Sequence, residues 1–138
     1  MNGSAALTVV MVDDTPPDVQ MVKRYLQKPR IPWSIEFISF LMPENGLEYL
    51  LKSKTDLLFL DYQFPTTDGL TFLKRLKKRK QPPPIILLTG KGNDDVAVRA
   101  FRREVEGYMT KENLNTQTLR RAIQRALSKE SLGKEIPL

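Results

Sequence analysis

Residues 56–60, DLLFL, decide the fold, and Asp61 follows them directly. The segment holds a row of apolar residues with no polar face, and it is too short for an ordinary helix. Runs of this kind are typical of strands that are buried on both faces of a parallel sheet. The sequence therefore predicts a central strand whose end carries a carboxylate.

Similar apolar runs alternate with helical patterns along the rest of the chain. Further strands are predicted at 7–12, 33–40, 85–88 and 105–110. Helices are predicted at 16–28, 43–54, 68–80, 93–103 and 116–129. This alternation indicates an α/β domain with a three-layer, doubly wound (βα)5 fold. Its parallel sheet is expected to have the flavodoxin-like order 2-1-3-4-5, which places the partly polar strand 33–40 at an edge.

Two helices allow more detailed predictions. Thr15 stands before two prolines and is a suitable N-cap for the first helix. The second helix is expected to place Leu47, Leu50 and Leu51 on its apolar side.

The composition fits one compact domain, because 41% of its 138 residues are hydrophobic. We expect a disordered N-terminus at 1–6, the folded domain at 7–129 and a tail at 130–138. The chain holds no cysteine and no histidine, which excludes disulfides and leaves zinc without its usual ligands. The absence of cysteine favours a cytoplasmic location. No membrane partner is expected, since no apolar stretch approaches the roughly 20 residues of a membrane span.

Chemically useful side chains follow several of the predicted strands. Asp13 and Asp14 follow the first strand, Asp61 the third, Thr89 the fourth and Lys111 the fifth. Sites in open parallel sheets form outside the carboxyl ends of the strands, so these side chains are expected to converge. Each residue alone is commonly a turn or surface residue. The hypothesis of a site depends on all of them standing at strand ends.

The chemistry of this set favours phosphoryl transfer. Clustered carboxylates repel one another unless a cation bridges them, and oxygen ligands suit Mg²⁺, with Mn²⁺ as the alternative. Lys111 offers a positive charge and Thr89 a hydroxyl donor to a phosphoryl group. A carboxylate can itself act as the nucleophile and form an aspartyl phosphate.

At this point the sequence resembles a receiver domain of a two-component response regulator. The resemblance covers about residues 7–128 and rests on VVMVDD (9–14), LLFLDYQFPTTDGL (57–70), ILLTGKGNDDVAVRAF (86–101) and YMTKENL (108–114). The spacing DxxxPxxDG from Asp61 through Pro65 to Asp68 and Gly69 is the most specific part.

The resemblance implies a role for each site residue. It makes Asp61 the phosphoacceptor, and it implies that Asp14, Asp61 and the backbone carbonyl of Gln63 bind Mg²⁺ directly, with Asp13 acting through water. Thr89 would donate a hydrogen bond to the phosphoryl group, and Lys111 would pair with it. Tyr108 matches the aromatic residue that rotates when the domain switches. All of these residues are present in the chain.

The resemblance also implies partners. The phosphodonor would be a phosphohistidine on a sensor histidine kinase or a histidine phosphotransfer protein. A downstream effector protein, or a second copy in a homodimer, would bind the face formed by the fourth helix, the fifth strand and the fifth helix. Such a domain is a switch with at most self-catalysed phosphorylation and dephosphorylation, not an enzyme with turnover. The chain is expected to be a stand-alone receiver or one excised from a longer protein.

The sequence departs from the receiver pattern at two places. Glu112 stands where most receivers have a proline after the lysine, so the loop before the last helix is expected to differ. Glu104 and Val105 replace a common pair of small residues, which points to an unusual partner face.

Two features of the sequence leave other functions open. A basic run at 74–80, with six Lys or Arg in seven residues, and a net charge of +6 leave nucleic-acid binding as an alternative. The run is equally typical of a solvated helix end. A receiver that binds partners without phosphorylation is the other alternative. A flavin or nucleotide site would need a phosphate-binding loop after the first strand, which this chain lacks. A phosphatase with an Asp nucleophile would need a second carboxylate two residues after Asp61, where this chain has Gln63.

Overall fold

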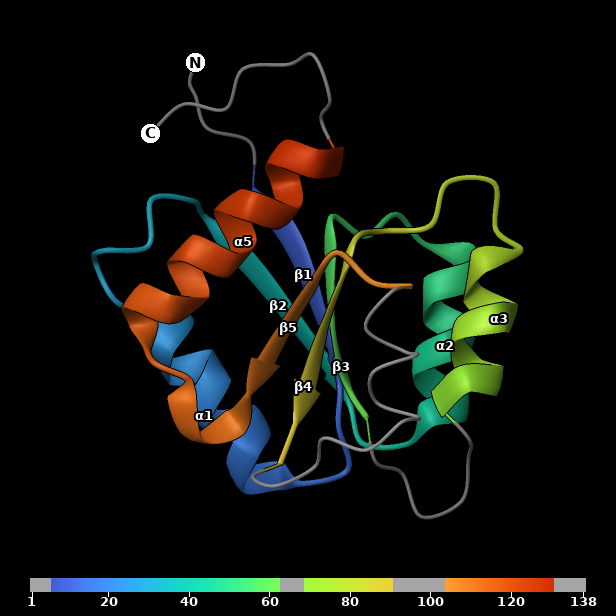
Figure 1. The fold of residues 1–138 in the computed structure, drawn as a ribbon, viewed down its shortest axis with the longest axis horizontal. Helices are drawn as coiled ribbons and strands as arrows, with labels where there is room; N and C mark the ends of the chain where they lie inside the picture. The colour runs from blue at the N-terminus through green and yellow to red at the C-terminus, as the bar shows by residue number, and fades with distance from the viewer. Residues whose placement is uncertain (1–5, 63–68, 91–103, 131–138) are drawn as a thin grey trace.

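The computed structural model describes residues 6–62, 69–90 and 104–130. Its five-stranded sheet has the order β2-β1-β3-β4-β5, and every neighbouring pair is parallel (Figure 1). The strands are β1 (Leu7–Val12), β2 (Ile35–Phe40), β3 (Leu57–Asp61), β4 (Ile85–Thr89) and β5 (Gly107–Thr110). The predicted fold class and strand order are confirmed.

Helices cover both faces of the sheet. They are α1 (Pro16–Leu26), α2 (Pro43–Lys52), α3 (Gly69–Lys77) and α5 (Thr116–Glu130). Figure 1 shows α1 and α5 on one face, and α2 and α3 on the other. A 3₁₀ turn, Lys111–Asn113, joins β5 to the chain that leads into α5. The helix predicted at 93–103 lies outside the described residues.

The burial of β3 explains its unbroken apolar run. Leu57 and Phe59 pack with the core under α1 and α5, whereas Leu58 and Leu60 pack with the core under α2 and α3. All of them are fully buried, because the side chains of a strand alternate between the two faces of the sheet. The strand is thereby held between two cores, and its last residue is delivered to the carboxyl edge of the sheet.

Several predicted boundaries were wrong by one or more residues. Helix α1 ends at Leu26, and β5 begins only at Gly107. Before β5, the backbone N–H of Glu106 donates to the carbonyl of Ile85 (2.9 Å), while the Glu106 carboxylate accepts from the Ile85 N–H (2.7 Å). A side chain thus replaces one backbone partner there, and the regular ladder starts one residue later.

Two details of the helices also differ from the prediction. Thr15 does occupy the N-cap position of α1, but its side chain makes no capping hydrogen bond in the described structure. Its backbone N–H donates instead to the carboxylate of Asp13. Leu51 is 39% exposed, because it points away from the sheet while Leu47 and Leu50 are buried.

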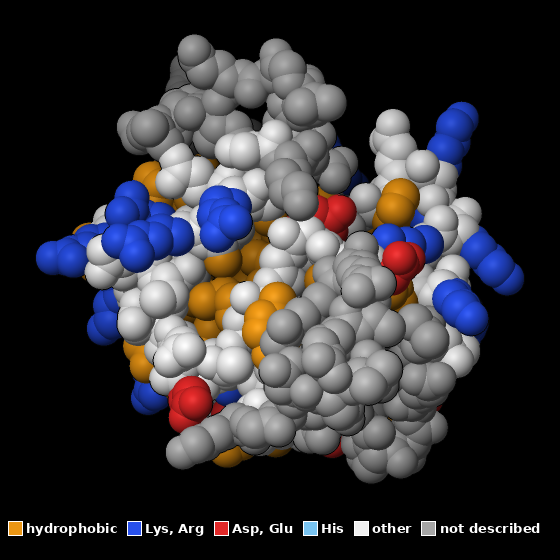
Figure 2. All heavy atoms as spheres, in the orientation of Figure 1, with side chains coloured by type: hydrophobic (Ala, Val, Ile, Leu, Met, Phe, Trp, Pro, Cys, Tyr) orange, Lys and Arg blue, Asp and Glu red, His pale blue; other side chains and the backbone are white. Residues whose placement is uncertain are grey.

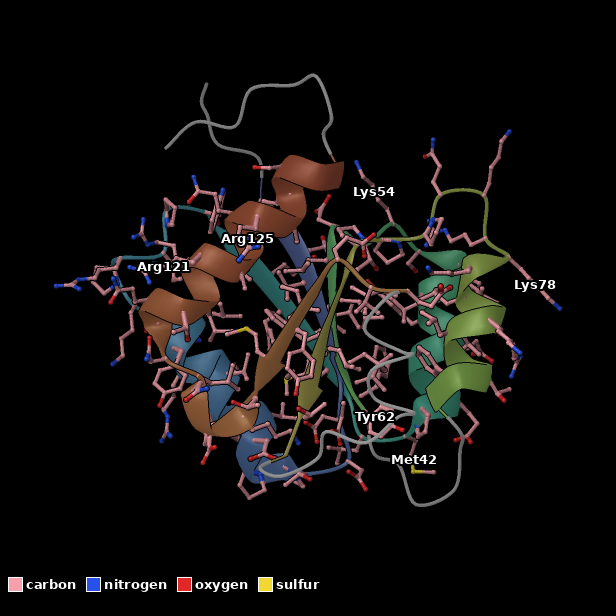
Figure 3. All side chains as sticks on the ribbon, in the orientation of Figure 1. Met42, Lys54, Tyr62, Lys78, Arg121 and Arg125 are labelled. Atoms are coloured by element: carbon pink, nitrogen blue, oxygen red, sulfur yellow. The ribbon has the colours of Figure 1, made fainter. Side chains whose placement is uncertain are left out.

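Basic side chains gather over the outer surfaces of two helices. Figure 2 shows Lys and Arg side chains over α5 on one side of the molecule and over α3 on the other. Figure 3 places Arg121 and Arg125 on α5 and Lys78 at the end of α3, whereas Tyr62 lies near the carboxyl ends of the strands. The basic surface is therefore separate from the edge where the acidic residues meet. Within the described ranges, none of the helices has the length and apolar character to cross a membrane.

Candidate functional site

The acidic pair Asp13-Asp14 continues the chain directly beyond β1. The backbone N–H of Asp13 donates to the carbonyl of Phe40 (3.0 Å), which prolongs the pairing of β1 with β2 by one residue. The side chain of Asp13 is fully buried, and its Oδ1 accepts the N–H of Thr15 at 2.9 Å. Asp14 is exposed, because successive side chains of an extended chain point in opposite directions. One carboxylate of the pair is therefore buried and the other is open to solvent.

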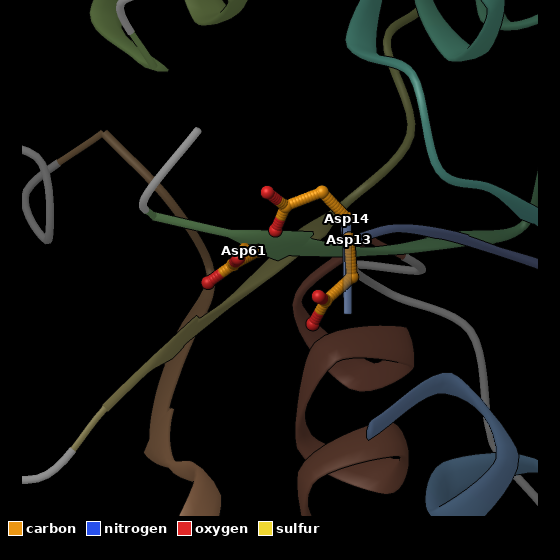
Figure 4. Close-up of side chains that lie close together, drawn as sticks. All are labelled: Asp13, Asp14 and Asp61. Atoms are coloured by element: carbon orange, nitrogen blue, oxygen red, sulfur yellow. The ribbon is translucent and has the colours of Figure 1, made fainter. Parts of the chain in front are cut away.

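Asp61 joins this pair from the neighbouring strand. It is the last residue of β3, next to β1 in the sheet, and only 5% exposed. Ligand oxygens of Asp13, Asp14 and Asp61 all lie within 4.8 Å of one another (Figure 4). The structure thus brings together the three carboxylates that the sequence placed at the ends of two separate strands.

Lys111 reaches the same place from the end of β5. Its Nζ lies 2.8 Å from Asp13 Oδ2 and 3.5 Å from Asp61 Oδ1. Its side chain is 16% exposed, so these contacts are largely shielded from water. A third carboxylate, that of Asp18, also lies 2.8 Å from Nζ. The ammonium group is therefore surrounded by carboxylates from three elements of the fold.

Thr89 and Tyr108 form a second pair beside this cluster. Thr89 ends β4 and is fully buried. Its hydroxyl donates to the hydroxyl of Tyr108 on the adjacent strand β5 at 3.2 Å. The two residues proposed for the switch are thus in direct contact. Gln63, whose backbone carbonyl completes the predicted metal ligands, lies outside the described residues.

Burial and charge shift two pKa values in the cluster. Burial raises the pKa of Asp13 above its ordinary value, although the hydrogen bond and charge of Lys111 oppose that rise. Burial lowers the pKa of Lys111, but the hydrogen bonds that its ammonium group donates to Asp13 and Asp18, with the charge of Asp61, outweigh it, so the net shift is upward. Lys111 therefore stays protonated at neutral pH.

The donor set fits a hard divalent cation. It offers oxygen ligands only, with two nearly buried carboxylates and one exposed carboxylate that leaves room for water. One ammonium group cannot neutralise Asp13, Asp14, Asp18 and Asp61 together, so the pocket keeps an excess of negative charge. Asp61 belongs to this carboxylate cluster and also lies 3.5 Å from the ammonium group of Lys111.

Asp18 is a site residue that the sequence reasoning missed. It lies in the first turn of α1, where an acidic residue is ordinarily explained by the positive end of the helix dipole. The one feature of the sequence that could have indicated a place in the site is its position shortly after the acidic pair. Glu112, the departure from the receiver pattern, is exposed and lies in the 3₁₀ turn after β5.

Comparison with known proteins agrees with this geometry. The profile of the response regulator receiver domain matches residues 9–124. The sensory transduction protein LytT of Bacillus anthracis is 31% identical over 134 residues, which is 94% of this chain and 52% of LytT. The transcriptional regulator NtrC of Escherichia coli K12 is 41% identical over 71 residues, covering 49% of this chain and 15% of NtrC. The chain thus spans at most about half the length of these relatives.

Solved structures support the same fold. A receiver domain protein from Clostridium thermocellum superposes with a TM-score of 0.76 at 23% identity, over 91% of this chain and 98% of the other. The receiver domain of a putative LuxO repressor from Vibrio parahaemolyticus gives 0.75 at 21% identity, over 93% and 95%. At these identities the superposition establishes the fold alone. The sequence profile covers nearly all of the folded segment, and by this match the chain belongs to the response regulator receiver domain family.

Proposed function

We propose that this domain is a phosphorylation switch that accepts a phosphoryl group on Asp61 from a phosphohistidine, with the help of Mg²⁺. The observation that carries the proposal is the position of Asp61. Its carboxylate lies within 4.8 Å of the acidic pair and 3.5 Å from the Lys111 ammonium group. A nucleophilic carboxylate beside a cation site and an ammonium group is suited to receive a phosphoryl group.

The transfer exchanges one bond for another. A carboxylate oxygen of Asp61 attacks the phosphorus atom while the bond from phosphorus to the donor imidazole breaks, and that nitrogen leaves with its electron pair. Asp13, Asp14 and Asp61, with the carbonyl of Gln63, would hold the cation. Bound Mg²⁺ supplies charge neutralisation for the phosphoryl oxygens. Lys111, whose ammonium group lies 3.5 Å from Asp61, would neutralise part of the remaining charge of the phosphoryl group.

The contact between Thr89 and Tyr108 supports a switch that starts at these two residues. The Thr89 hydroxyl donates to Tyr108 in the described state. A phosphoryl group on Asp61 is a stronger acceptor than a phenol, so Thr89 turns toward it and gives up this bond. Tyr108 then changes its position on β5, and the face that includes β5 and α5 presents a different surface to an effector protein or to a second copy. The domain acts as a phosphoacceptor switch, and its chemistry is limited to its own Asp61.

Acetyl phosphate tests this proposal. In the presence of Mg²⁺ we expect intact mass measurements to show one added phosphoryl group, which is lost in Asp61→Asn and when EDTA removes the metal. Asp56→Asn is the matched control, because Asp56 stands just before the same strand at its opposite end, where its carboxylate accepts the Thr8 N–H. Phosphoryl uptake by Asp61→Asn, or uptake without a divalent cation, would contradict the proposal.

A further inference from the structure

Asp18 contacts the site without belonging to the carboxylate cluster. Its Oδ2 lies 2.8 Å from Lys111 Nζ, as close as Asp13 Oδ2. The side chain of Asp18 is 28% exposed and comes from α1, whereas Lys111 follows β5, 93 positions later. Three carboxylates of the described residues lie beside Lys111, those of Asp13, Asp18 and Asp61. Of these three, Asp18 alone is outside the candidate metal cluster.

This arrangement sets two cations in competition for the same carboxylates. Without a metal, Lys111 is paired with Asp13 and lies near Asp61, which are also two of the candidate metal ligands. A divalent cation that binds there withdraws negative charge from Lys111 and repels its ammonium group. Lys111 can stay in the largely buried pocket only if another anion remains beside it, because an unpaired buried charge is costly. Asp18 is that anion.

We propose that Asp18 is a positioning residue, which holds Lys111 beside Asp61 while Mg²⁺ occupies the carboxylate cluster. Without Asp18, the ammonium group depends on Asp13 and Asp61 alone and competes with the metal for them. With Asp18, the metal takes these carboxylates while Lys111 keeps a partner. Lys111 is then already in place when a phosphoryl group arrives on Asp61. This inference rests on the Mg²⁺ binding proposed above.

A double-mutant cycle on Mg²⁺ affinity separates this role from a general effect of charge. MgCl₂ is titrated into the unphosphorylated protein, and the dissociation constant is taken from NMR amide chemical shifts. We expect Asp18→Asn to weaken Mg²⁺ binding about fivefold when Lys111 is present, a size typical of coupled neighbours. In the Lys111→Met background, where no ammonium group competes, the same change should weaken binding less than about twofold. Asp18→Glu keeps the charge and should recover most of the affinity.

A charge change far from the site serves as the control for this cycle. Glu48→Gln removes one negative charge from an exposed position on α2 and should leave the affinity unchanged. Thermal unfolding of each variant verifies the fold, and Asp18→Ser replaces Asp18→Asn in the cycle should the latter not fold. An equal effect of Asp18→Asn in both backgrounds, or no effect in either, would overturn the role of Asp18. Absence of Mg²⁺ binding in the unmutated protein would instead overturn the proposed function, and the inference with it.

Discussion

Replacement of Lys111 by Met tests the electrostatics of the pocket most directly. The change keeps an unbranched side chain that is one atom shorter and removes its charge. At 2.8 Å and an effective dielectric constant of about 20, each contact with Asp13 and Asp18 carries an attraction of about 6 kcal/mol before desolvation is subtracted. Breaking a mostly buried pair leaves the fully buried carboxylate of Asp13 without its cation. We therefore expect the free energy of unfolding to fall by about 3 kcal/mol at neutral pH without metal.

Urea denaturation in EDTA measures this loss, and Lys77→Met is the matched control. Lys77 lies 3.7 Å from Glu104, and the two side chains are 40% and 54% exposed, so this change should cost less than about 1 kcal/mol. Added Mg²⁺ should stabilise Lys111→Met more than the unmutated protein, because no ammonium group competes for the carboxylates. The variant should nevertheless respond poorly to phosphorylation, since the phosphoryl group loses its fixed cation.

The loss should also depend on pH, with a sign set by Asp13. Burial raises the pKa of Asp13 above its ordinary value of 3.8, and removal of Lys111 takes away a contact that opposes the rise. A carboxyl group whose pKa is higher in the folded than in the unfolded protein stabilises the fold at pH values below its unfolded pKa. This stabilisation is lost as the pH rises through the folded pKa. The cost of Lys111→Met should therefore shrink as the pH is lowered from about 7 to about 4. A variant as stable as the unmutated protein at neutral pH, or a cost that does not change with pH, would refute the reasoning.

Two further predictions concern the packing around the site. Gly46→Ala should lower the free energy of unfolding by about 2 kcal/mol, because its Cβ would lie 2.7 Å from Val12 Cγ2 in the core. Urea denaturation measures this loss. Gly90→Ala is the control, since a Cβ there meets no atom of the described residues within 4 Å. Equal losses of stability at both positions would contradict the prediction. Tyr108→Phe should cost about 1 kcal/mol by removing the acceptor of the Thr89 hydroxyl, and should leave phosphoryl uptake by mass measurement intact. Loss of uptake in this variant would place Tyr108 in the chemistry and not in the switch.

The strands were the most predictable part of the fold. The apolar run of β3 has a single economical explanation, burial on both faces, and the structure confirms it for Leu57 through Leu60. The ends of the elements were predicted less well because they depend on contacts with distant residues. Glu106 is an example, since its carboxylate bonds to the Ile85 N–H and delays the start of β5. Leu51 is another, because the helical period alone does not tell which residues at the margin of an apolar stripe face the core.

The convergence of the candidate site was also predictable, though its details were not. Residues that end parallel strands must share one edge of the sheet, so the positions of Asp13, Asp61 and Lys111 followed once the strands were known. Which of the adjacent carboxylates is buried could not be read from two identical residues in succession. The hydrogen bond between Asp13 and the Thr15 N–H decides it, together with the packing of α1 against the sheet.

The strands and the side chains at their ends could be predicted from the sequence, because apolar periodicity and strand ends are local properties of the chain. The strand order and the carboxyl edge that carries the site followed from the few topologies open to alternating strands and helices. Only the tertiary structure decided that Asp18 lies 2.8 Å from Lys111 and that Asp13 is the buried member of its pair. The ion pair joins residues 93 positions apart, one in the first turn of α1 and the other directly after β5. A side chain has no local preference for so distant a partner, and the contact exists only once the sheet has brought both elements to the same edge.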